Sequence, residues 1–271
     1  MPVFQLSPVA DLVRRLDPEL FHTALFASEP GRDRLMVLYA FDIELSRAAA
    51  QTSEPMIARM RLQWWRDALA EADAGAPARQ HEIAEPMHGL LRNHRLDRAD
   101  LDSLIEAREA ELEGSFDEAQ FLAWADGRFG ALTRLACALL CEEDEFARRA
   151  ATAAGQVLAV AYLLRQGMRL AAEANCFLLP GLGPEDRAAL ARGKVTSHAE
   201  ATARQHAAQA EAVLHAARAE TGVVPKAALP ALLPLARAER VLSQARFLFP
   251  HEDAPARRGP LLFWRALRGR W

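Results

Sequence analysis

Two acidic side chains on one expected helix are of a type that could hold a metal ion. Asp42 and Glu44 lie in VLYAFDIELSRAAA, residues 37–50. They are two residues apart, so on an α-helix they point about 200° apart and cannot chelate one ion together. The pair alone therefore predicts no metal site.

Two further acidic groups have ordinary explanations. Glu173 follows Arg169 at the i,i+4 spacing of an exposed ion pair. The acidic run at residues 142–145 lies at an expected helix start, where carboxylates favour the helix dipole. We interpret the first as a surface pair and the second as a solvated helix cap.

Other catalytic patterns are missing from the sequence. The eight histidines form no HExxH motif, and no GxGxxG, Walker or GxSxG motif occurs. The three cysteines include no CxxC pair, which indicates a reducing compartment without a disulfide framework. Cys137 and Cys141 share a helical face among leucines, so we expect small core residues rather than reactive thiolates.

Composition and charge limit the class of protein. With 271 residues, 51% hydrophobic and 25% charged, the chain is expected to form one globular domain over residues 1–271. A formal net charge of −3 disfavours nucleic acid as a partner. The sequence shows neither a secretory signal nor an uncharged run near the ~20 residues of a membrane span. We expect a cytoplasmic protein, with peripheral contact with the inner membrane left open.

The elements that must position any site are helices. Ala, Leu, Arg and Glu abound, apolar residues recur at three and four, and Pro and Gly divide the segments, so the pattern predicts an all-α fold. The expected helices are 7–14, 18–28, 32–51, 55–73, 81–93, 97–113, 117–141, 144–173, 184–192, 196–220, 226–247 and 260–268.

Three strings in this order resemble the squalene/phytoene synthase family: LYAF at 38–41, RLQWWRDAL at 61–69 and LLRQGMRLAAEANCFLLP at 163–180. Two more strings are similar to one branch of that family, the phytoene-synthase-like assembly factors for respiratory complex I. These strings are HRLDRADLDSLIEAREAEL and VVPKAALPALLPLARAERVL. The resemblance implies an isoprenoid-synthase-like bundle of ten to twelve helices around a central cavity.

Active members of the family ionise an allylic diphosphate with Mg²⁺, which carboxylates on two facing helices hold. The resemblance puts the first acidic motif on Ser46, Arg47 and Ala50, and none is acidic. It puts the second motif on Tyr162, Arg165, Gln166 and Leu170, where only the arginine matches. We therefore expect no cofactor and no Mg²⁺-diphosphate chemistry.

A cavity without these acids would be less negative and more apolar. It could hold a prenyl or acyl chain, with Arg165 meeting an anionic head group. The faces expected to line it carry Tyr39, Ile43, Ser46 and Ala50 on one helix and Ala159, Tyr162, Gln166, Arg169 and Leu170 on the other. Trp64 is a further ligand-binding candidate, although core packing with a cation–π contact from Arg61 or Arg66 also explains it.

The segment 254–271 carries five arginines among leucine and aromatic residues. It is expected either to pack on the bundle, which we favour, or to lie at an anionic membrane surface.

Three functions remain open from sequence. In the first, the chain is a non-catalytic member of the family that assists complex I assembly, with respiratory subunits or a lipid as partners. Alternatively it is an active head-to-head prenyltransferase with an atypical Mg²⁺ site, or a helical scaffold without an open cavity.

Overall fold

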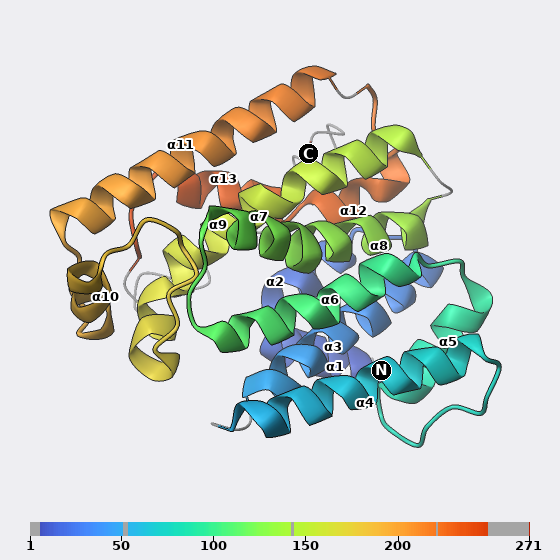
Figure 1. The fold of residues 1–271 in the computed structure, drawn as a ribbon. Coiled ribbons are helices and arrows are strands. Elements are labelled where there is room, and N and C mark those ends of the chain that lie inside the picture. Colours follow the sequence, from blue (N-terminus) through green and yellow to red (C-terminus); the bar gives the residue numbers. More distant parts are fainter. Residues whose placement is uncertain (1–5, 51–53, 142–143, 221, 249–270) are drawn as a thin grey trace, which may run out of the picture.

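The computed structural model describes residues 6–50, 54–141, 144–220, 222–248 and 271, and these residues form an all-α fold (Figure 1). The α-helices are α1 (Pro8–Leu16), α2 (Pro18–Ala24), α3 (Glu29–Ala50), α4 (Pro55–Asp73), α5 (Ala84–Asn93), α6 (Arg98–Ala110), α7 (Glu118–Ala125), α8 (Ala131–Leu140), α9 (Glu145–Ala174), α10 (Pro184–Ala191), α11 (Ser197–Glu220), α12 (Leu229–Leu232) and α13 (Leu235–Leu242). Two short 3₁₀ segments, η1 (Glu111–Glu113) and η3 (Lys226–Ala228), and a π-helix, η2 (Asp126–Gly130), complete the described elements.

The helices are stacked in order from α11 through α9 and α8 to α6 and α4 (Figure 1). Helix α9 is central because it packs against α8, α11, α13 and η2. It begins where the Asp144 carboxylate accepts a hydrogen bond from the Ala147 N–H at 2.8 Å, which confirms the helix cap expected there. It ends at Asn175 in the left-handed region, at φ 49°. No helix of the described residues is both long and apolar enough to cross a membrane.

Two of the expected helices are each divided into three elements in the structure. The helix expected over 117–141 is divided into α7, the π-helix η2 and α8, and the helix expected over 226–247 is divided into η3, α12 and α13. Pro230 and Pro234 account for the second division, because proline donates no backbone hydrogen bond and clashes with the preceding turn. The helix expected over 260–268 lies outside the described residues.

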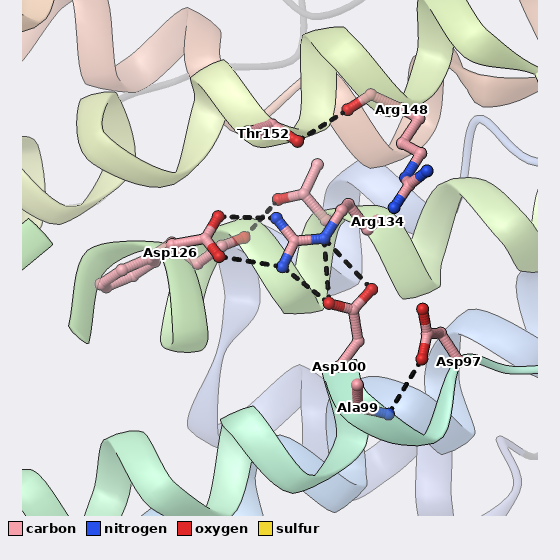
Figure 2. A network of polar contacts seen from close by, with 9 residues as sticks. Asp97, Ala99, Asp100, Asp126, Arg134, Arg148 and Thr152 are labelled. Carbon is pink, nitrogen blue, oxygen red and sulfur yellow. Dashed lines mark hydrogen bonds and ion pairs between the residues drawn. The ribbon is translucent and has the colours of Figure 1, made fainter. Parts of the chain in front are cut away.

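A partly buried arginine, Arg134, connects the π-helix η2 to α6 and α8. Arg134 of α8 lies between Asp100 of α6 and Asp126 of η2 (Figure 2), with its Nε 2.9 Å from Asp100 Oδ1 and an Nη 2.6 Å from Asp126 Oδ1. Burial acts to lower the pKa of Arg134, but its hydrogen bonds to the two carboxylates outweigh this and raise it. Gly130 leaves room for this arrangement, because a Cβ there would lie 2.6 Å from Asp126 Oδ1.

The central helix approaches this π-helix closely at Gly155. A Cβ on Gly155 would lie 3.0 Å from the Gly130 nitrogen and 3.1 Å from the Ala125 carbonyl oxygen. These are backbone atoms, which cannot rotate away as a side chain would. We expect Gly155→Ala to lower the free energy of unfolding by about 1–3 kcal/mol despite the better helix propensity of alanine, as measured by urea denaturation.

Gly89→Ala on α5 is the matched control. A Cβ there meets nothing within 4 Å, so the same substitution is expected to raise the free energy of unfolding by about 0.5–1 kcal/mol. Equal responses at the two glycines would contradict the close approach of α9 to η2.

Candidate functional site

A cavity of about 140 Å³ lies between α2, α3, α8, α9 and the α12–α13 segment, with η2 closing one side. Leucine, alanine, proline and Phe129 make up its apolar wall. Its polar wall consists of Asp17, Glu19, Tyr39, Asp42, Arg128, Thr133, Tyr162 and Arg165. The helices that carry the altered acidic motifs, α3 and α9, both contribute, so an open cavity is present where the resemblance implied one.

Buried arginines hold the carboxylates beside this cavity. Arg108 of α6, whose side chain is 1% exposed, donates to Asp42 Oδ1 at 2.7 Å and to Glu111 Oε1 at 3.3 Å. Glu111 also accepts from Arg128 at 2.7 Å and from the Trp124 indole N–H at 3.0 Å. These charge-assisted bonds offset the cost of burying the carboxylates.

Arg128 stays charged in this setting. Its guanidinium lies over the Tyr162 ring, 4.2 Å from the ring centroid, and close to the Trp124 and Phe129 rings. Burial acts to lower the pKa of Arg128, but the charge of Glu111 outweighs it and the pKa is raised. The cavity wall therefore has a fixed cation within an aromatic cluster.

A second ion-pair cluster joins distant segments of the chain. Glu19 of α2 pairs with Arg237 of α13 at 2.6 Å and with Arg165 of α9 at 3.5 Å. All three side chains are less than one fifth exposed. Arg165, which we expected to meet an anionic head group, is thus already paired with a carboxylate of the same chain.

Asp17 is the carboxyl group at the cavity with a markedly shifted pKa. It caps α2 by accepting from the Leu20 N–H at 2.9 Å. Burial raises its pKa to about 6, helped by the charges of Glu19 and Asp42, while the Leu20 hydrogen bond and Arg165 act to lower it. A carboxyl group whose pKa is raised by folding stabilises the fold below its unfolded pKa, and this contribution is lost as the pH rises through about 6.

Asp17→Asn is therefore expected to stabilise the protein at pH 8 by about 1–2 kcal/mol, and to have little effect at pH 4. The amide oxygen of asparagine can still accept the Leu20 N–H, so the helix cap is retained. Urea denaturation of both proteins at the two pH values measures the difference. A difference that does not change with pH would contradict the raised pKa.

The structure places the sequence-predicted residues in different surroundings. Tyr39, Tyr162 and Arg165 line the cavity. Within the described chain, the other named residues do not: Ile43 and Ala159 are buried elsewhere, Ser46 is half-buried, Ala50 is exposed, and Leu170 lines a separate small cavity beside Phe247. Arg169 is exposed and donates to Gln166 and Glu173, which confirms the expected surface pair.

Trp64 lies in an aromatic cluster away from the cavity. Its ring is 4.9 Å from that of Trp65 and 5.4 Å from that of His81. Arg79 makes the cation–π contact, 4.9 Å from the Trp64 ring centroid, while Arg66 pairs with Glu109. The expectation that Arg61 or Arg66 would make this contact therefore missed Arg79.

Sequence reasoning also missed Arg108, Glu111 and Arg128. One signal was available: Leu101, Leu104, Ile105 and Arg108 occupy one face of α6, so an arginine continues an apolar stripe.

Cys137 is buried, which raises the pKa of its thiol, and burial likewise raises the pKa of Cys141. This agrees with the expectation of core residues.

The residues present do not fit the Mg²⁺ that the resemblance implies. Asp42 lies four residues before Ser46 on α3, and it is bound to Arg108. Among described residues, no group of three or more His, Cys, Asp or Glu side chains is placed to hold a metal ion. The Glu44 carboxylate instead accepts a bond from Arg47 at 2.5 Å.

Comparison with known proteins adds sequence and fold relatives. Residues 13–257 match the family model described as Squalene/phytoene synthase. The chain is 27% identical over 157 residues to NADH dehydrogenase (ubiquinone) complex I, assembly factor 6 from Bos taurus, and 25% identical over 160 residues to the protein of that name from Homo sapiens. Each match covers 57% of this chain and 47% of the relative, so the chain spans about half the length of the curated relatives it matches.

Two solved structures share the fold. Squalene synthase HpnC from Alicyclobacillus acidocaldarius matches with a TM-score of 0.71 at 16% identity, over 87% of this chain and 90% of that one. A dehydrosqualene synthase in complex with ligand matches with a TM-score of 0.72 at 11% identity, over 96% and 94% of the two chains. The expected isoprenoid-synthase-like fold is thereby confirmed.

Proposed function

Because the chain belongs to the squalene/phytoene synthase family, we propose that it is a non-catalytic member that assists the assembly of respiratory complex I. The observation that carries the proposal is the pairing of the interior carboxylates with arginines. Asp42 and Glu111 bind Arg108, and Glu111 also binds Arg128. In this fold, guanidinium groups neutralise acids that would otherwise be free to attract a divalent cation.

This pairing bears directly on catalysis. Ionising an allylic diphosphate requires a cation that neutralises the charge developing on the leaving oxygens. Mg²⁺ prefers carboxylate, phosphate and water oxygens. A carboxylate already bonded to a buried arginine would have to break that ion pair first, leaving a cation without a partner in the interior, which is costly.

The relatives support the assembly role. The Bos taurus and Homo sapiens relatives are named as complex I assembly factors, and each is similar to this chain over more than half of this chain's length. The partners in this proposal are complex I subunits, with a lipid as a ligand of the cavity. We keep the expectation of a cytoplasmic protein in peripheral contact with the inner membrane.

Deleting the gene is the experiment that tests this role. We expect NADH:quinone oxidoreductase activity of the membranes to fall while squalene and carotenoid levels stay unchanged, and a copy of the wild-type gene to restore the activity. Normal oxidoreductase activity in the deletion strain would contradict the assembly role. Loss of squalene or carotenoids would instead support the prenyltransferase alternative.

A further inference from the structure

The cavity has a hydroxyl group without a partner. Tyr39 is 1% exposed and lines the cavity, and no hydrogen bond to its hydroxyl is present among the described residues. Among the described residues, this hydroxyl does not belong to the polar atoms that are both fully buried and unpaired, so it can be reached from the cavity, and leaving it without water or a ligand would be costly. A ligand oxygen in the cavity would satisfy it.

The charges around the cavity are balanced. In the described part of the chain, the wall and its ion-pair partners carry four arginines, Arg108, Arg128, Arg165 and Arg237, and four carboxyl groups, Asp17, Glu19, Asp42 and Glu111. A diphosphate would bring several negative charges into this interior, where each of these described arginines is already matched by a carboxyl group. A neutral ligand leaves the balance unchanged.

The volume limits the size of the ligand. An engineered apolar cavity of about 150 Å³ binds benzene. The cavity here, of about 140 Å³, is of that size and has a largely apolar wall. It therefore accepts a group of roughly six heavy atoms, such as one isoprene unit or one small ring.

From these three observations we propose that the cavity binds the neutral, hydroxyl-bearing end of a hydrophobic molecule, with Tyr39 as its hydrogen-bond partner, and that it rejects the corresponding diphosphate. The inference rests on the proposed non-catalytic function and specifies the chemistry of its ligand. Two sources share this chemistry, a branched isoprenoid alcohol and a ring that carries a hydroxyl group.

Binding to the full-length protein is measured by NMR titration with three probes. Prenol (3-methylbut-2-en-1-ol) represents one isoprene unit and phenol represents the ring, while dimethylallyl diphosphate carries a charged diphosphate on the prenol skeleton. We expect saturable binding of at least one neutral probe, and the tighter of the two identifies the source. Dimethylallyl diphosphate is expected to bind at least about tenfold more weakly than prenol, with or without Mg²⁺.

Two substitutions locate the ligand. Tyr39→Phe removes the hydroxyl and keeps the ring, and is expected to weaken binding of the neutral probe about fivefold. Ala161→Leu on α9 fills the cavity and is expected to weaken it at least about tenfold. Ala153→Leu, on the same helix but lining an outer groove, is the control and should bind as the wild type does.

Three results would each overturn the inference: no saturable binding of either neutral probe, diphosphate binding as tight as that of prenol, or Ala161→Leu binding as tightly as Ala153→Leu. The proposed function is tested by a different experiment, the gene deletion. If the neutral probes do not bind but the deletion strain still loses oxidoreductase activity, the ligand inference is wrong and the assembly role stands.

Discussion

Replacing Arg108 with methionine is expected to lower the free energy of unfolding by about 3–5 kcal/mol. The substitution keeps an unbranched apolar stem but removes the guanidinium group and its positive charge. Asp42 then loses its 2.7 Å partner, and Glu111 keeps only Arg128 and Trp124. Because the Arg108 side chain is 1% exposed, water does not easily replace the lost bonds. Urea denaturation at pH 7 measures the loss.

Arg149→Met is the matched control for this prediction. Arg149 also pairs with a carboxylate, Glu145, but the two side chains are 55% and 71% exposed. Exposed pairs of this kind contribute about 0–1 kcal/mol. Adding Asp42→Asn to Arg108→Met is expected to recover part of the stability, since it removes the carboxylate left unpaired. Equal losses in the two arginine variants would contradict an interior ion-pair network.

The helical fold was predictable from local sequence. Pro55 and Pro184 begin helices in the structure, and Gly75 and Gly114 adopt positive φ where helices end, as the turn signals indicated. The division of 226–247 was also readable, because Pro230 and Pro234 lie within it. The π-helix at 126–130 was not, since its contacts include Arg134, which also bonds to Asp100, 34 residues before it.

The site was only partly predictable for a similar reason. Tyr39 and Tyr162 could be placed at the cavity because they lie on the helices of the two altered motifs. The pairing of Arg108 with Asp42 joins residues 66 positions apart, and Arg79 reaches Trp64 through the loop that follows α4. Helical periodicity specifies a face of one helix, but it does not specify which side chain of another helix meets that face.

Turnover of a prenyl diphosphate is the second result expected to be large. Beside the cavity, Asp42 and Glu111 are bound to Arg108 or Arg128, and Glu19 is bound to Arg237. Among the described residues, no group of acidic side chains is placed to hold Mg²⁺ against a leaving diphosphate. We expect the rate with farnesyl or geranylgeranyl diphosphate to lie more than about a thousandfold below that of an active synthase of the family. Arg108→Met is not expected to restore it, because it frees Asp42 without supplying the second acidic motif.

Incubating the purified protein with Mg²⁺ and farnesyl diphosphate therefore tests the central claim most directly, with an active dehydrosqualene synthase assayed in parallel. The account predicts that pyrophosphate release does not rise above that of a blank without protein, while the active synthase converts the substrate. Mg²⁺-dependent formation of a head-to-head product by the protein would contradict the claim that arginines have taken the place of the metal.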